Sequence, residues 1–131
     1  MQVKALDYVV LIVHDLDRSL AFYTGVLGLP LGHRSGSYAQ LATGATRLSL
    51  FERGAMATTL GAEELAVPDT AATAFEIGFK VDDVDAAYSE LIAAGAIGAV
   101  PPTTRPWGQR TAYIRDPDGH LVELAQDGVR G

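Results

Sequence analysis

The chain has 131 residues, of which 48% are hydrophobic and 20% charged, and this predicts one globular unit or two small modules that share a core. Its net charge of −6, without runs of like charge, argues against nucleic acid or anionic lipid as a partner. The lack of cysteine excludes disulfides, thiolate nucleophiles and zinc–sulfur sites. The apolar run at residues 8–13 is too short for a signal peptide or a membrane span, so we expect a cytoplasmic protein.

The first part of the chain predicts a strand, a helix and a hairpin. Residues 8–13 are β-branched and strand-like, and helical spacing follows, with Asp15 as N-cap and Gly25 or Gly28 as the stop. Strands at 38–42 and 47–51, parted by a turn at 43–45, predict a hairpin. A further strand is expected at 29–34.

The stretch 53–73 shows no clear period and contains Pro68, so it predicts a connection with room for a short helix at 61–65. Beyond it come a strand at 76–81, a helix at 83–94 that Gly95 ends, and strands at 99–100, 110–115 and 120–125. We therefore expect a first module at residues 1–55, a connection at 56–73 and a second module at 74–131.

The two modules are related by an internal repeat. Residues 13–17, Val-His-Asp-Leu-Asp, match residues 81–85, Val-Asp-Asp-Val-Asp, and this alignment pairs Asp15 with Asp83 and Tyr8 with Glu76. Chance rarely places the same cap, turn and apolar positions at one spacing, so the sequence predicts duplication of a strand–helix–strands unit.

Two motifs carry a family resemblance. Residues 6–10, 15–23 and 26–29 resemble the opening signature of the vicinal oxygen chelate superfamily, which includes glyoxalases, bleomycin-resistance proteins and extradiol dioxygenases. Residues 107–110, Trp-Gly-Gln-Arg, and 116–124, Asp-Pro-Asp-Gly-His-Leu-Val-Glu-Leu, resemble its closing signature. The resemblance implies an α+β, glyoxalase-like fold of two βαβββ modules, whose curved mixed sheets surround a cavity. The alternative is a generic α+β repeat protein with the same turns.

The resemblance also implies where a metal would bind. In metal-dependent relatives the first and last strands of each module supply four ligands, usually two His and two Glu, and these positions fall here on Tyr8, Ser49, Glu76 and Glu123. Only two are carboxylates and none is His, so we expect no metal cofactor. The alternative is a divalent metal ion on Glu76 and Glu123. The histidines His14, His33 and His120 are expected to lie outside the cavity, His120 as a solvated side chain.

Strand alternation gives a separate view of the two carboxylates. It puts Ile77, Phe79 and Val81 on the helix side of their strand and leaves Glu76 on the polar face, with Lys80 as the one basic residue there. Glu123 falls on the same face of its own strand. Both become candidate ligand contacts, the alternative being that they are solvated at open sheet edges.

Aromatic residues complete the predicted site. Five aromatic residues are expected to form stacking walls for a planar or cationic ligand: Tyr8, Tyr38, Phe51, Trp107 and Tyr113. Core packing is an equal alternative for Trp107. Arg110 is interpreted as a residue that holds a turn. Phe22, Tyr23 and Tyr88 lie at apolar helical spacing and are expected in the core.

Three functions stay open at this point. The first is a small-molecule-binding protein of the antibiotic resistance kind, similar to bleomycin-resistance proteins, that sequesters a cationic or planar ligand without a metal. The second is a glyoxalase-like lyase, isomerase or dioxygenase-related enzyme, in which Glu76 or Glu123 acts as a base, with an atypical metal site or none. The third is an interaction module whose cavity is filled by its own side chains. In each case we expect a homodimer, because small sheets leave apolar edges.

Overall fold

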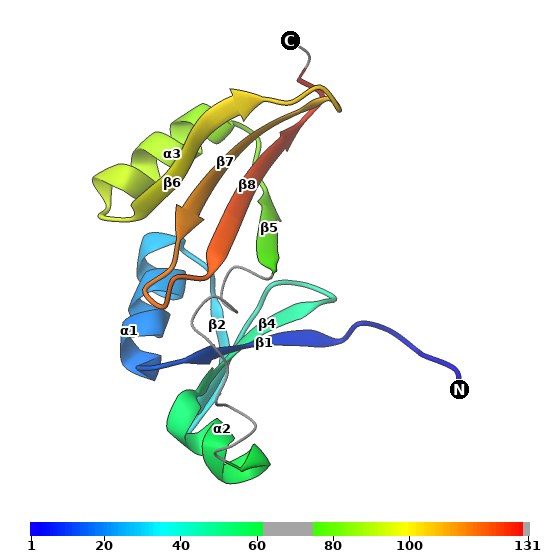
Figure 1. Cartoon of the computed structure of the whole chain (residues 1–131), viewed down its shortest axis with the longest axis vertical. Coiled ribbons are helices and arrows are strands. Elements are labelled where there is room, and N and C mark those ends of the chain that lie inside the picture. Colours follow the sequence, from blue (N-terminus) through cyan, green and yellow to red (C-terminus); the bar gives the residue numbers. More distant parts are fainter. Residues whose placement is uncertain (62–74, 130–131) are drawn as a thin grey trace. The chain divides into compact units, whose positions relative to one another are not determined.

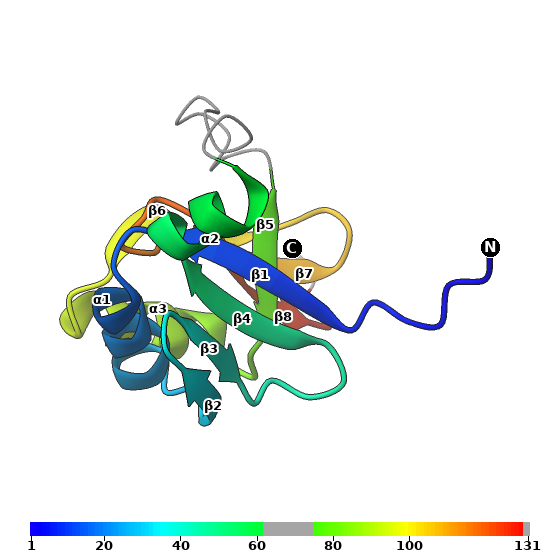
Figure 2. The same ribbon diagram turned by 90° about the horizontal axis from the view of Figure 1, so that it is seen from below.

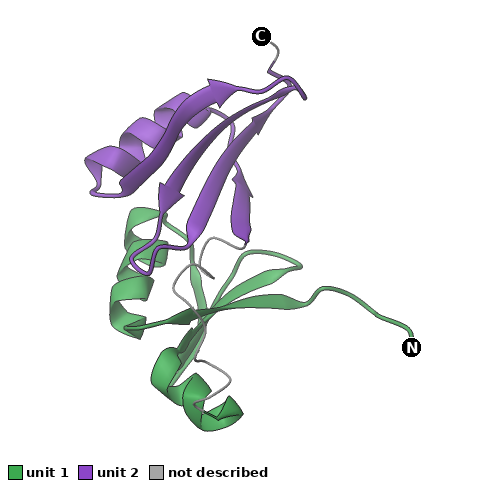
Figure 3. Ribbon diagram, viewed as in Figure 1, with its two compact units in different colours: residues 1–67 green, residues 68–131 purple. Residues whose placement is uncertain are grey.

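A computed structural model describes residues 1–61 and 75–129 of the chain. The chain divides into two compact units, residues 1–67 and 68–131, and each unit contains one four-stranded sheet (Figure 3). Both units have the strand–helix–three-strand order, which confirms the predicted α+β fold of two βαβββ modules. Within the described residues, no helix has the length and apolar character needed to cross a membrane.

The first unit is a mixed sheet with a helix on one face (Figure 2). The strand order is β1-β4-β3-β2, in which β1 and β4 are parallel and the other neighbours antiparallel. Parallel pairing of the first and last strands requires that the chain cross over between them. The elements are β1 (Tyr8–Val13), α1 (Leu16–Leu20), the π-helical η1 (Ala21–Val26), β2 (Leu31–Ser35), β3 (Tyr38–Leu41), β4 (Arg47–Glu52) and α2 (Arg53–Leu60).

The second unit repeats this topology. Its strand order, β5-β8-β7-β6, has the same parallel pair followed by two antiparallel pairs, and α3 lies along one face of the sheet (Figure 1). The elements are β5 (Glu76–Lys80), α3 (Val84–Ala93), β6 (Ile97–Thr104), β7 (Gln109–Arg115) and β8 (Leu121–Asp127).

The helix ends explain why both units form the same local structure. Asp15 Oδ1 accepts a hydrogen bond from the Arg18 amide at 3.2 Å, and Asp83 Oδ1 accepts one from the Ala86 amide at 3.1 Å. These two N-caps are the residues that the repeat aligns, and each satisfies an amide that the helix leaves free. Gly95, at φ +96°, follows the end of α3 in the left-handed conformation expected of a stop. The predicted caps are confirmed.

Each core lies between a sheet and its helix. Alternate side chains of β1, β3, β4, β7 and β8 are buried there, together with Phe22 and Tyr23, whose rings meet edge to face at 5.0 Å. Tyr88 is only half-buried. The sheet residues that reach the core are Leu11, Val13, Ala39, Leu41, Leu48, Leu50, Ala112, Ile114, Val122 and Leu124.

Two helical segments differ from the sequence prediction. α2 occupies residues 53–60, where the sequence showed no helical period. None of its side chains is buried, so its apolar residues do not need to recur at helical spacing. η1 widens the end of the first helix: the Leu27 amide donates to the Phe22 carbonyl at 2.9 Å, while the Thr24 hydroxyl donates to the Leu20 carbonyl at 2.5 Å. The short helix expected at 61–65 lies outside the described residues after Gly61.

Candidate functional site

Strand register places the predicted site residues at matching points of the two sheets. Ser49 lies opposite Val10 in β1, and Glu123 lies opposite Gly78 in β5. Val10 and Gly78 are each two residues beyond Tyr8 and Glu76, so the four positions form two equivalent pairs. Each pair lies on the sheet face that points away from the helix, which we call the open face of that unit.

The open face of the second unit carries a carboxylate–phenol pair. Tyr113 faces Glu123 directly across β7 and β8, and its hydroxyl donates a hydrogen bond of 2.5 Å to Glu123 Oε2. The other carboxylate oxygen, Glu123 Oε1, lies over Gly78. A Cβ atom added to Gly78 would be 3.4 Å from this oxygen. This hydrogen bond, with burial and the nearby negative charges, raises the pKa of Tyr113 to about 12.

Glu76 is the second carboxylate on this face. Its side chain is exposed, and partial burial followed by the charge of Glu123 raises its pKa above the ordinary 4.5. Within residues 1–61 and 75–129, neither Glu76 nor Glu123 has an ion-pair partner. The face therefore presents two neighbouring anions without a bound counter-charge.

The basic residues of this face differ from the prediction. Lys80 was expected as the one cation, but it forms an ion pair of 2.6 Å with Asp127. Arg105 reaches the same face from the loop after β6 and donates from Nε to Thr111 Oγ1 at 2.9 Å. The expectation of a single basic residue was wrong. Arg115 in β7 lies opposite Leu121 and so shares the face of Tyr113, and its Nη1 donates to the Gly119 carbonyl at 3.0 Å. Arg105 lies outside the strands, where alternation makes no assignment.

The open face of the first unit is a network of neutral groups. Ser49 is fully buried, and its Oγ lies 2.9 Å from the Tyr38 hydroxyl, which also accepts a hydrogen bond from Gln40 Nε2 at 3.2 Å. Tyr8 is 52% exposed at the start of β1. His33 lies opposite Gln40 and so shares its face, contrary to the expectation that no histidine would.

The donors at the four family positions do not fit a divalent metal ion. Glu76 and Glu123 supply charged oxygens, whereas Tyr8 and Ser49 supply neutral hydroxyls, and no imidazole is among them. Ser49 is buried against Tyr38, and Tyr113 already occupies one oxygen of Glu123. A divalent ion needs several charged or strongly donating ligands that are free to coordinate it.

His120 was expected to be solvated, and that expectation was wrong. The residue is 8% exposed, and its Nδ1 lies 2.7 Å from Asp116 Oδ2. Asp116 Oδ1 accepts hydrogen bonds from the amides of Asp118 and His120 at 3.0 and 2.8 Å. The buried carboxylate draws the ring into the turn. The ligand atoms of Asp116, Asp118 and His120 lie within 4.8 Å of one another. The Asp-x-Asp-x-His spacing is the sequence signal for this cluster, which sequence reasoning missed.

Trp107 lies in the loop before β7, and Arg110 lies near the start of β7. Trp107 is 64% exposed, so the core-packing alternative is wrong, and its Nε1 donates to Gln109 Oε1 at 2.9 Å. Arg110 Nη1 donates to Thr104 Oγ1 at 2.9 Å across the turn between β6 and β7, as expected of a residue that holds a turn. Arg110 also binds both carboxylate oxygens of Asp85, at 2.8 and 2.9 Å, and so joins β7 to the first turn of α3.

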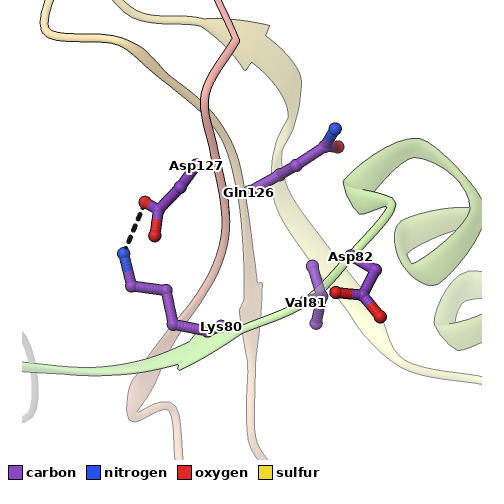
Figure 4. Close-up of a pocket in the computed structure, with 5 residues that line it drawn as sticks. All are labelled: Lys80, Val81, Asp82, Gln126 and Asp127. Carbon is purple, nitrogen blue, oxygen red and sulfur yellow. Dashed lines mark hydrogen bonds and ion pairs between the residues drawn. The ribbon is translucent and has the colours of Figure 1, made fainter.

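A small pocket of about 310 Å³ lies where β5 and β8 end (Figure 4). Lys80, Val81, Asp82, Gln126 and Asp127 line it. The polar groups are largely used within the unit, because Lys80 pairs with Asp127 and Gln126 Oε1 accepts the Val84 amide at 3.0 Å. The hydrogen bond of Gln126 therefore stabilises the start of α3, and Glu76 and Glu123 do not line this pocket.

The fold agrees with the relatives of the chain. The model of the Glyoxalase/Bleomycin resistance protein/Dioxygenase superfamily matches residues 5–124, and the chain belongs to this superfamily. It is 36% identical over 117 residues to the uncharacterized protein YraH of Bacillus subtilis (strain 168), covering 87% of this chain and 91% of YraH. It is 31% identical over 130 residues to a probable lactoylglutathione lyase of Vibrio parahaemolyticus, covering 88% of this chain and 85% of that protein.

The similarity extends to solved structures. TnmS3, an antibiotic binding protein from Streptomyces sp. CB03234, superposes with a TM-score of 0.73 at 24% identity, covering 97% of this chain and 98% of TnmS3. At this level of identity the likeness concerns the fold.

Proposed function

We propose that the protein is a small-molecule-binding member of the superfamily that sequesters a cationic or planar ligand without a metal ion. The observation that carries the proposal is the pair of carboxylates, Glu76 and Glu123, on one open face without an ion-pair partner among the described residues. Anions that lack a counter-charge attract a cation, and the attraction strengthens when a ligand excludes water from them.

Two further features support this function. Trp107 leaves most of its ring exposed, and an exposed aromatic ring provides a stacking surface for a planar or cationic ligand. TnmS3, whose fold is similar, is an antibiotic binding protein. The donors at the four family positions do not fit a divalent ion, which favours a binding role that needs none.

Benzylamine, a planar ring with one positive charge, tests the proposal. Its binding to the wild type and to Glu76→Gln is followed by the fluorescence of Trp107, the only tryptophan in the chain. We expect Glu76→Gln to weaken binding about tenfold, the scale of one charge-assisted contact. Glu90→Gln, which removes an exposed glutamate on α3, is the matched control and should bind as the wild type does. Equal affinities for all three proteins would contradict the proposal.

A second candidate is a glyoxalase-like lyase. The Vibrio parahaemolyticus relative is named a probable lactoylglutathione lyase, and the raised pKa of Glu76 brings it nearer to the range useful for a general base. An assay of lactoylglutathione lyase activity, with and without added divalent metal, separates the candidates. Activity that Glu76→Gln abolishes would favour the enzyme.

We also propose that the protein is a cytoplasmic homodimer. The edge strand β6 supports the dimer, because Ile97 and Val100 on it are 62% and 37% exposed to solvent. Apolar side chains on a free strand edge are commonly covered by a second chain.

A further inference from the structure

Arg105 is held firmly at the open face of the second unit. Its amide donates to the Gln109 carbonyl at 2.7 Å, and its own carbonyl accepts the Gly108 amide at 3.2 Å, so its backbone is fixed in the loop between β6 and β7. Its side chain is oriented by the bond from Nε to the hydroxyl of Thr111, which is fully buried. Little conformational entropy remains to be lost when this guanidinium binds another group.

The charge of Arg105 is nevertheless not neutralised. Arg34, Arg47 and Arg110 each form an ion pair with an aspartate, at 2.8, 2.6 and 2.8 Å. Arg105 forms none with the described residues, and its single hydrogen bond there goes to a neutral hydroxyl and uses Nε. The two terminal nitrogens, which form the fork that binds carboxylates and phosphates, remain available.

Opposite charges therefore lie near each other on this face without touching. Thr111 lies opposite Ala125, two residues beyond Glu123, so Thr111 and Glu123 are diagonal neighbours about 7 Å apart. Glu123 directs one oxygen to the Tyr113 hydroxyl, and no carboxylate among the described residues reaches the Arg105 guanidinium within ion-pairing distance. If Arg105 served only to balance Glu123, the two would be expected to pair directly.

We infer that the open face of the second unit is a binding site for a zwitterion, in which Arg105 binds an oxyanion of the ligand while Glu76 and Glu123 bind its cationic group. The inference rests on the proposed function. It narrows the ligand class from cations to compounds whose positive and negative groups are separated by about one aromatic ring. Arg105 is then the residue that determines specificity. A simple cation leaves the Arg105 charge without a partner, and a simple anion is repelled by the two carboxylates.

Three probes that share one ring test the inference: benzylamine as the cation, benzoate as the anion and 4-(aminomethyl)benzoate as the zwitterion. Their affinities for the wild type are measured by calorimetry. We expect the zwitterion to bind about tenfold more tightly than benzylamine, and benzoate to bind most weakly. In Arg105→Gln this advantage of the zwitterion over benzylamine should disappear, whereas the affinity for benzylamine should be kept or slightly improved.

Two further variants separate binding from folding. Arg105→Lys keeps the charge and should retain part of the advantage, and Arg34→Gln, which removes an arginine from the first unit, should retain all of it. Tight binding of benzylamine that depends on Glu76, with no gain for the zwitterion, would overturn this inference and leave the proposed function standing. Failure of all three probes to bind would overturn both.

Discussion

Replacement of Glu123 by Gln tests the carboxylate–phenol pair directly. The substitution keeps the shape of the side chain and an oxygen that accepts a hydrogen bond, but it removes the negative charge. Since the hydrogen bond to Glu123 is the largest cause of the raised pKa of Tyr113, we expect that pKa to fall from about 12 toward its ordinary 10.0. The smaller contributions of burial and of the Glu76 charge should keep it somewhat above 10.0.

The same pair affects stability at high pH. The pKa of Tyr113 is higher in the folded chain than in the unfolded chain, so the folded state holds this proton more tightly. The stabilisation is complete below the unfolded value of 10.0 and is lost as the pH rises from there through about 12. Because Tyr113 is half-buried, solvent screens the interaction and we expect it to contribute on the order of 1 kcal/mol.

Carbon-13 NMR of labelled tyrosine provides the assay. The chain has five tyrosines, so the spectrum of Tyr113→Phe identifies the Tyr113 signal. The signal is followed from pH 8 upward in the wild type, in Glu123→Gln and in Glu90→Gln, which removes a carboxylate far along the chain as a control. A Tyr113 pKa that stays near 12 in Glu123→Gln would refute the reasoning, as would an equal decrease in the control.

Three other predictions concern the metal, the α3 anchor and the assembly. Protein purified without chelator should retain no stoichiometric divalent metal by elemental analysis, whereas one ion per chain that Glu76→Ala with Glu123→Ala removes would support the enzyme. Arg110 lowers the pKa of Asp85 below its ordinary 3.8, so this ion pair stabilises the fold above pH 3.8 and less as the pH falls below it. Thermal unfolding of Arg110→Gln should therefore differ more from wild type at pH 7 than at pH 3, and equal differences would contradict this. Light scattering should give twice the 13.8 kDa chain mass, and a monomer would exclude the dimer.

The repeated fold was predictable because its signals are local. An aspartate cap, a glycine stop and alternating apolar side chains act on residues within a few positions, so the two βαβββ modules are visible in the sequence. The same locality explains the correct placement of Phe22 and Tyr23 in the core. α2 escaped prediction because a helix without buried side chains leaves no periodic pattern.

Sequence alternation alone put Glu76 and Glu123 on the polar faces of their strands, and the family positions drew attention to Tyr8 and Ser49. Strand register decided the rest. It brought Tyr113 within hydrogen-bonding distance of Glu123, and a loop bond to Thr111 brought Arg105 onto the same face. The fold buried His120 against Asp116. The charge balance of this face and the pKa of Tyr113 depend on groups that are close in space but distant in sequence, or that a loop holds in place. The tertiary structure therefore determined the chemistry of this face.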